Sequence, residues 1–323
     1  MLLDVLLLVG GAVVLAYSGN RLVDFAAAVA ENARLTPAVI GLTVVAAGTS
    51  APELVVSVTG ALQGSPGIAM GNVVGSNLAN IGIILGACAL ITPIPVARGV
   101  LRFEYPFLVL ASWIALLLSR DGWLDRLEGV FFLASMVVFT AYVVWVARRE
   151  ITVAEKSLVG EAVPDQAARL RLKPAWTLAL GILAAIVGLV LGAQALVSAA
   201  VSMARALGVS ERVVGLTVVS VGTSLPELAV SLSAALRKQQ EMAVANVVGS
   251  NIFNLLMILG AAALARPLLI DQRIISVDLW VMMAFTVMLL PLVYRRGLLT
   301  RSGGACLLTA YACYVAWLAW NPH

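Results

Sequence analysis

A 46-residue block occurs twice in this chain, and it constrains the fold more than any other feature. Residues 41–86 read GLTVVAAGTSAPELVVSVTGALQGSPGIAMGNVVGSNLANIGIILG, and residues 215–260 read GLTVVSVGTSLPELAVSLSAALRKQQEMAVANVVGSNIFNLLMILG. The two blocks align without a gap and share roughly 26 identities, more than chance gives two unrelated apolar helices. The chain is therefore predicted to consist of two related halves.

The composition places these halves in a membrane. The chain is 61% hydrophobic and only 12% charged, whereas a soluble domain is nearer 25% charged. Apolar runs of about 20 residues recur, which is the length that an α-helix needs to cross the hydrocarbon core. Charged or Pro/Gly breaks predict ten spans, near 2–30, 36–62, 67–90, 103–119, 127–147, 174–206, 211–236, 242–265, 275–294 and 303–320.

The spacing of the blocks predicts how the halves are related. Five spans separate one block from the other, and an odd number of crossings inverts the second copy. We expect an all-α membrane protein with ten transmembrane helices arranged as two inverted five-helix repeats, 1–147 and 174–323, joined by a hydrophilic linker at 148–173. The first and sixth spans exceed one perpendicular crossing, and either tilt or an interfacial extension would absorb the excess.

Lys and Arg residues predict the orientation. The loops on the side of the 148–173 linker carry more than twice as many of them as the opposite loops, so the positive-inside rule puts the linker in the cytoplasm and both termini outside. The first run carries Asp4 where a signal peptide has positive charge, and we expect it to be a retained span. The net charge of +4 comes without a basic stripe, so no nucleic-acid partner is expected.

Each block carries one glutamate inside a span, Glu53 and Glu227. An ionisable residue at membrane depth is costly and is a functional hypothesis by default. The alternative is a structural glutamate that is protonated or paired with an arginine, but neither span has a Lys or Arg near it. Because the same residue occurs at the same place in both halves, we favour a shared ion site.

Hydroxyl and amide side chains accompany both glutamates. Thr49 and Ser50 precede Glu53 by four and three residues, as Thr223 and Ser224 precede Glu227, so they share its helix face. Ser76 and Asn80, like Ser250 and Asn254, also lie one turn apart. The alternative for these side chains is back-bonding or close packing. Interhelical hydrogen bonding is at least as good an interpretation as ion binding for four further amides, Asn72, Asn77, Asn246 and Asn251.

Two prolines should break the glutamate helices. Pro52 and Pro226 lack an N–H and clash with the carbonyl four residues back, at Gly48 and Gly222. Irregular backbone at membrane depth occurs where it lines a cavity, and freed carbonyls suit cations. We therefore expect backbone oxygens to add to the site.

The donor set selects the class of ion. Carboxylate, hydroxyl, amide and carbonyl oxygens are all hard ligands, and the one histidine is His323. Zinc, copper and nickel prefer nitrogen or sulfur. Calcium takes six to eight oxygens, two carboxylates neutralise one Ca²⁺, and magnesium is reluctant to lose its waters. Sodium can use the same oxygens, and no Lys or Arg of the site holds an anion.

The GTSxPEL and GSNxxN sequences resemble the α-repeats of the calcium/cation antiporter superfamily, the sodium/calcium exchangers, in a compact prokaryotic form. The resemblance implies a ten-helix exchanger that moves Ca²⁺ against Na⁺ by alternating access, with Glu53 and Glu227 as the central Ca²⁺ site. It implies further ion ligands at Thr49, Ser50, Thr223, Ser224, Ser76, Ser250, Asn80 and Asn254. Backbone carbonyl ligands are implied at Ala46 and Ser220.

Two departures from the superfamily bear on coupling. Potassium-dependent members carry Asp where Asn254 stands, which argues against potassium dependence. Proton/calcium exchangers show a second acidic residue where this chain reads GNVVGS and ANVVGS, which disfavours proton coupling without excluding it. The large regulatory domain of animal exchangers is absent from the sequence.

We therefore expect a non-enzymatic antiporter of a prokaryotic inner membrane that exchanges Ca²⁺ for Na⁺. Its expected partners are these two ions and the lipid bilayer, with no cofactor and no obligate protein partner. The alternatives are an H⁺/Ca²⁺ exchanger, a glutamate-lined cation channel, and a scaffold without transport, which leaves the duplicated glutamates unexplained.

Overall fold

The computed structural model describes residues 2–33, 35–96, 98–150, 170, 173–206, 220–294 and 297–320. Within these ranges the protein is nearly all helical. The longer helices are α1 (Leu2–Asn32), α4 (Ala51–Leu62), α5 (Pro66–Ala79), α8 (Glu104–Leu118), α9 (Arg126–Glu150), α11 (Ala175–Ala206), α14 (Leu225–Leu236), α15 (Gln240–Phe253), α17 (Leu279–Tyr294) and α18 (Arg301–Trp320).

Short elements join and extend these helices. The short α-helices are α2 (Pro37–Ile40), α3 (Ala46–Thr49), α6 (Gly86–Ile91), α7 (Arg98–Arg102), α13 (Ser220–Thr223) and α16 (Leu259–Ala265). Four π-helical segments occur among the described residues, η1 (Gly41–Val45), η2 (Asn80–Leu85), η6 (Asn254–Ile258) and η7 (Ile274–Asp278), together with the 3₁₀ turn η3 (Ser119–Asp121). The sequence analysis did not predict the π-helices.

Two very short antiparallel ladders connect distant parts of the chain. β1 (Ile94–Pro95) pairs with β4 (Leu298–Leu299), with Ile94 opposite Leu299. β2 (Trp123–Leu124) pairs with β3 (Leu268–Leu269), with Trp123 opposite Leu269. Each ladder therefore joins a segment that follows the first 46-residue block to one that follows the second.

Seven helices in the described residues are long and apolar enough to cross a membrane, and an eighth span results if a bent pair counts as one. The bent pair is Pro37–Thr49 with Ala51–Leu62, at 46°. The predicted span at 211–236 is described only in part, and its apolar helix Leu225–Leu236 is short; α18 is not among the seven. The described residues thus support an integral membrane protein without establishing ten spans.

The predicted linker is largely outside the described residues, which omit 151–169, 171 and 172. Its first residues continue α9, which ends at Glu150 and not at residue 147. The helix persists because the apolar run carries straight into it without a Pro or Gly stop.

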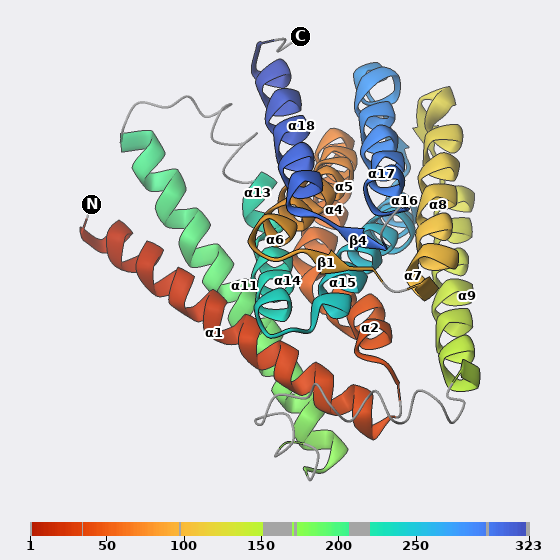
Figure 1. Ribbon diagram of the computed structural model, residues 1–323. Helices are drawn as coiled ribbons and strands as arrows, with labels where there is room; N and C mark the ends of the chain where they lie inside the picture. The colour runs from red at the N-terminus through yellow and green to blue at the C-terminus, as the bar shows by residue number, and fades with distance from the viewer. Residues whose placement is uncertain are drawn as a thin grey trace.

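The helices that carry the repeated block occupy the centre of the protein (Figure 1). In the span Pro66–Ile91 72% of the apolar window is buried, and in Gln240–Ala265 83% is buried, against 22% in Leu3–Asn32. The α4 helix packs on α5, and α14 packs on α15. Most of the residues in these two central spans are therefore shielded from the surroundings by protein.

The α1 and α11 helices lie side by side and are inclined to α8, α17 and α18 (Figure 1). A Cβ atom on Gly11 would lie 2.8 Å from the Gly192 carbonyl oxygen, and one on Gly192 would lie 3.0 Å from the Gly11 carbonyl oxygen. Small residues permit such close backbone approach between membrane helices.

A buried ion pair ties α1 to the rest of the protein. The Asp24 side chain on α1 is fully buried and pairs with Arg237, which follows α14, and with Arg21 at 3.7 Å. Arg237 Nε also donates a hydrogen bond to Asn20 Oδ1 at 2.8 Å. Because a buried carboxylate is costly without a partner, these contacts fix one end of α14 against α1.

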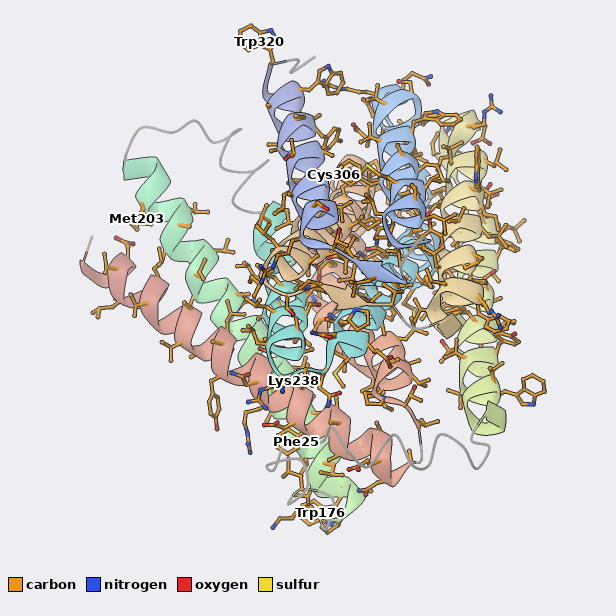
Figure 2. The ribbon with its side chains drawn as sticks, viewed as in Figure 1. Phe25, Trp176, Met203, Lys238, Cys306 and Trp320 are labelled. Carbon is orange, nitrogen blue, oxygen red and sulfur yellow. The ribbon has the colours of Figure 1, made fainter. Side chains whose placement is uncertain are left out.

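Exposed tryptophan side chains lie at both ends of the protein. Figure 2 shows Trp176 near the start of α11 and Trp320 at the end of α18, at opposite extremes of the molecule. The side chains of both are exposed, and tryptophan is enriched where membrane helices meet the headgroup regions. Cys88 is buried, whereas Cys306 and Cys313 on α18 are exposed.

Candidate functional site

Both glutamate helices are broken one residue after the threonine of the GTSxPEL sequence. Ser50, with φ −84° and ψ 9°, separates α3 from α4. Ser224, with φ −86° and ψ 6°, separates α13 from α14. Pro52 and Pro226 then fall in the first turn of the new helix, where no N–H is needed. The predicted proline break is confirmed in both copies.

The break places each glutamate in the first turn of a helix. Glu53 lies in the first turn of α4 and Glu227 in the first turn of α14. Both side chains are only 1% exposed. The positive end of the helix dipole favours an anion at this position, so the local backbone offsets part of the cost of burying each carboxylate.

Hydrogen bonds connect the two glutamates crosswise. Ser50 Oγ donates to Glu227 Oε1 at 2.8 Å, and Ser224 Oγ donates to Glu53 Oε1 at 3.4 Å. Each serine therefore serves the glutamate of the other block, 171 or 177 residues away. The two glutamates and the two serines therefore form one cluster.

Among the described residues of this region, six buried oxygens left without a partner form three pairs related by the repeat, and Asn246 Oδ1 is also left without a partner. Buried oxygens without a hydrogen-bond partner in the described structure include Glu53 Oε2, Glu227 Oε2, Ser76 Oγ, Ser250 Oγ, Asn80 Oδ1 and Asn254 Oδ1. All six belong to residues predicted for the site. A buried polar atom without a hydrogen-bond partner is costly, and all six atoms are oxygen donors of the kind that Ca²⁺ accepts.

The asparagines of the site stand where helix geometry changes. Asn80 is the first residue of η2 and Asn254 the first residue of η6. Single π-helical turns in α-helices are frequent at functional sites. Ser76 and Ser250 lie one turn earlier, in α5 and α15, and are buried.

The sequence left open whether Thr49 and Thr223 are ion ligands or hydrogen-bond to their own helix. Thr49 Oγ1 donates to the Ala46 carbonyl oxygen at 3.3 Å, which is back-bonding, and it also lies beside Glu227. The half-buried Thr223 lies beside Glu53. The Ala46 carbonyl also accepts from the Ser50 N–H at 3.0 Å. Ser220 begins α13.

Asn72 and Asn246 act as interhelical hydrogen-bonding residues. Asn72 Nδ2 donates to Ser57 Oγ at 2.9 Å and to the Glu53 carbonyl oxygen at 3.1 Å. Asn246 Nδ2 donates to Ser231 Oγ at 3.0 Å. The sequence analysis missed Ser57 and Ser231, although each lies four residues after a glutamate and is duplicated.

The cluster presents carboxylate and hydroxyl oxygens, which are hard ligands. Two buried carboxylates at close range repel each other when both are ionised, and a cation between them relieves the repulsion. The described residues contain no group of three or more His, Cys, Asp and Glu side chains placed to hold a metal. The charge of the cluster therefore comes from two carboxylates.

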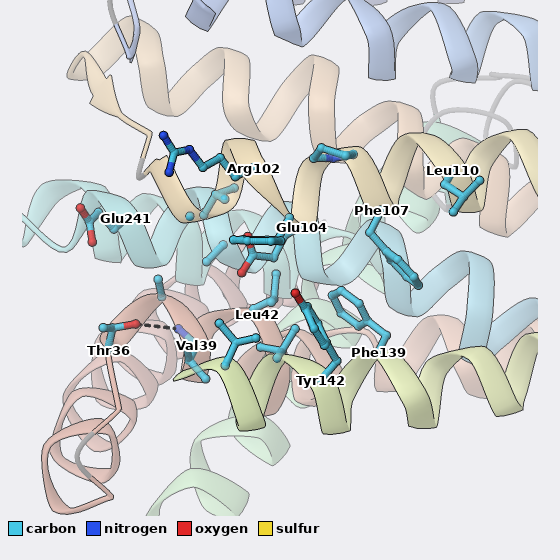
Figure 3. A pocket seen from close by; sticks show the side chains of 18 residues that line it. Thr36, Val39, Leu42, Arg102, Glu104, Phe107, Leu110, Phe139, Tyr142 and Glu241 are labelled. Carbon is cyan, nitrogen blue, oxygen red and sulfur yellow. Dashed lines mark hydrogen bonds between the residues drawn. The ribbon is translucent and has the colours of Figure 1, made fainter. Parts of the chain in front are cut away.

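A cavity of about 590 Å³ lies elsewhere, between α2, α8, α9 and α15 (Figure 3). Its wall includes Phe107, Phe139 and Tyr142, and Arg102 and Glu241 also line it. None of the predicted ion ligands lines this cavity. It is separate from the glutamate cluster.

Comparisons with known proteins find relatives along nearly the whole chain. The family described as "Sodium/calcium exchanger protein" matches residues 3–145 and 177–320. The inner membrane protein YrbG of Escherichia coli is 36% identical over 322 residues, with 99% of this chain and 97% of that protein covered. The sodium/calcium exchanger MaX1 of Methanosarcina acetivorans is 30% identical over 347 residues, with 96% and 97% covered.

Among solved structures, the sodium–calcium exchanger NCX_Mj soaked with 2.5 mM Na⁺ and 0.1 mM Ca²⁺ has the same membrane fold. Its TM-score is 0.82 at 29% sequence identity, and 98% of each chain is covered. The similarity therefore extends over the whole chain.

Proposed function

Because this chain belongs to the sodium/calcium exchanger protein family, a family of membrane transporters, we propose that it exchanges Ca²⁺ for Na⁺ by alternating access. The ions bind between the two halves, at a site centred on Glu53 and Glu227. The observation that carries the proposal is the crossed Ser50–Glu227 and Ser224–Glu53 pairing, which makes one site from the two blocks.

The proposed architecture is ten transmembrane helices in two inverted five-helix repeats, 1–147 and 174–323, around a cytoplasmic linker at 148–173. The offset of 174 residues that takes residue 41 to residue 215 supports it. The same offset takes α3 onto α13, α4 onto α14, α5 onto α15 and β1 onto β3. Inverted repeats with a central site are the plan of many secondary transporters.

The proposed ligands beyond the two glutamates are Thr49, Ser50, Thr223, Ser224, Ser76, Ser250, Asn80, Asn254 and the backbone oxygens of Ala46 and Ser220. The unpartnered oxygens of Ser76, Ser250, Asn80 and Asn254 support four of these assignments. Ca²⁺ and Na⁺ share the oxygens, so the site cannot hold a full complement of both ions.

Charge balance explains the coupling between the two ions. One Ca²⁺ neutralises the two carboxylates, and Na⁺ ions at the same oxygens do so together. A site that is empty or half filled keeps uncompensated buried charge, which is costly at membrane depth. We propose that only loaded forms pass between the inward and outward faces, which couples the flux of one ion to that of the other.

We further propose a prokaryotic inner membrane as the location, with both termini outside. The Lys and Arg excess on the linker side supports this orientation, and the relative YrbG is named an inner membrane protein. The transported ions and the lipid are the proposed partners.

A flux measurement in proteoliposomes tests the proposed ion pair. Purified full-length protein is reconstituted into vesicles loaded with Na⁺, and tracer Ca²⁺ uptake follows dilution into Na⁺-free buffer at equal pH. We expect internal Ca²⁺ to exceed the external concentration, because outward Na⁺ movement drives it.

Two parallel conditions separate the alternatives. Uphill uptake under a pH gradient alone, with none under a Na⁺ gradient, would overturn the proposal in favour of H⁺/Ca²⁺ exchange. Uptake that only equalises the two concentrations would indicate a channel. Empty liposomes prepared in the same way give the leak.

A further inference from the structure

We infer that Asn77 and Asn251 are positioning residues that turn the side-chain amides of Asn254 and Asn80 so that their oxygens face the ions. The inference rests on the proposed cation site and deepens it. Neither Asn77 nor Asn251 has to contact an ion for this role. Each acts on the asparagine of the opposite block.

The hydrogen bonds between the four amides have one direction. Asn254 Nδ2 donates to Asn77 Oδ1 at 3.0 Å, and Asn80 Nδ2 donates to Asn251 Oδ1 at 2.9 Å. All four side chains are at most 1% exposed. Asn80 Oδ1 and Asn254 Oδ1 are left without a partner in the described structure, whereas the oxygens of Asn77 and Asn251 are used.

Acceptor-only groups fix the direction of these bonds. Asn251 Nδ2 donates to the Asn77 backbone carbonyl at 3.3 Å, and Asn77 Nδ2 donates to Met282 Sδ at 3.5 Å. A carbonyl oxygen and a thioether sulfur accept hydrogen bonds and cannot donate them. A flipped Asn251 or Asn77 would set its own oxygen against an acceptor, so each must present its oxygen to Asn80 or Asn254.

The orientation of each proposed ligand amide is set by the asparagine that it bonds to. Because Asn77 and Asn251 offer only an oxygen, Asn254 and Asn80 must offer their NH₂ groups in return. Their oxygens then point away, as free ligands. An aspartate at position 254 would have no NH₂ group to give, and its carboxylate would face Asn77 Oδ1 acceptor to acceptor.

The hydrogen bonds that orient Asn251 and Asn77 differ in strength. Asn251 donates to a carbonyl oxygen, whereas Asn77 donates to a thioether sulfur, which is a weak acceptor. The amide of Asn254 is therefore held less firmly than that of Asn80. The asymmetry distinguishes the two halves of a site that is otherwise symmetric.

A double-mutant cycle separates positioning from a structural role. Leucine is close to asparagine in shape and removes both hydrogen-bonding groups, so Asn77→Leu should raise the Ca²⁺ KM about 10–100-fold, as for lost partners of metal ligands, with a smaller change in kcat. In an Asn254→Leu background, Asn77→Leu should add almost nothing to the KM. In an Asn80→Leu background its effect should be undiminished, since the Asn77 carbonyl remains.

Direct Ca²⁺ binding by calorimetry on the same purified proteins accompanies the cycle. Tyr105→Phe serves as the matched control, because it removes another buried interhelical hydrogen bond, from Tyr105 Oη to the Thr286 carbonyl at 2.7 Å, between two residues outside the repeated blocks. It should leave the Ca²⁺ KM unchanged.

Each failure has its own signature. If Asn77→Leu shifts the KM equally with and without Asn254, or leaves it unchanged while the wild type binds Ca²⁺, the positioning role is wrong and the proposed function stands. If the wild type binds no Ca²⁺, the proposed function itself fails. If Asn77→Leu does not fold, Met282→Leu replaces it in the cycle, with a smaller expected KM shift that must also vanish with Asn254→Leu.

Discussion

Replacing either buried glutamate by glutamine, as Glu53→Gln or Glu227→Gln, is expected to abolish Ca²⁺ uptake into vesicles. The glutamine oxygen can still accept the hydrogen bond from Ser224 or Ser50, so the cluster keeps its shape. One negative charge is lost, however, and the remaining carboxylate cannot balance a Ca²⁺ whose hydration has been removed. Tracer uptake under a Na⁺ gradient measures the effect.

The matched control for both variants is Glu241→Gln, the same chemical change at an exposed position. It should transport at the wild-type rate. Equal expression and equal elution on size-exclusion chromatography must accompany the loss of activity in the two site variants. Wild-type uptake by both Glu53→Gln and Glu227→Gln would contradict the account.

The second large effect is expected from Gly249→Ala. A Cβ atom at Gly249 would lie 2.4 Å from the Leu42 carbonyl oxygen and 2.8 Å from the Leu42 Cα. Both atoms are backbone, so α15 and η1 must separate. Overpacking costs about 1–3 kcal/mol or more, and the shift would displace Ser250 and Asn254. We expect a lower melting temperature and loss of Ca²⁺ uptake.

Gly71→Ala is the control for this substitution. Gly71 is exposed, nothing lies within 4 Å of the position of its Cβ, and the second block has Ala245 in its place. This variant should fold and transport normally. Gly249→Ala with wild-type stability and uptake would show that the close approach between α15 and η1 is not required.

The local features of the site could be predicted from the sequence because they depend on neighbouring residues. Pro52 and Pro226 break their helices through their own covalent structure, and the break was found at Ser50 and Ser224. The burial of Glu53 and Glu227 followed from the apolar length of the chain on either side.

The contacts between the blocks could not be predicted in the same way. Which serine donates to which glutamate depends on how two segments more than 170 residues apart approach each other. The π-helical turns at Asn80 and Asn254 depend on packing as well, since the i to i+5 pattern leaves no sequence signal. The two-residue strands are too short to show any periodicity.

The asparagines show where sequence reasoning reached its limit. Asn77 and Asn80 are both amides in one GSNxxN sequence, and nothing in their spacing says which one has a free oxygen. Which oxygen is free depends on two acceptors, Met282 Sδ on a distant helix and the backbone carbonyl of Asn77. Neither acceptor can be recognised from the sequence pattern. Duplication predicted which residues would lie together, and the surrounding acceptors determine how the asparagine amides are oriented.

The central claim is that Glu53 and Glu227 together hold one transported cation. Anomalous scattering from crystals of the protein soaked in Ca²⁺ tests it most directly, because the signal locates the ion without reference to activity. The account predicts a central peak with an oxygen of each glutamate within about 2.3–2.6 Å. Two separate peaks with one glutamate each, or Ca²⁺ bound only away from both residues, would contradict it.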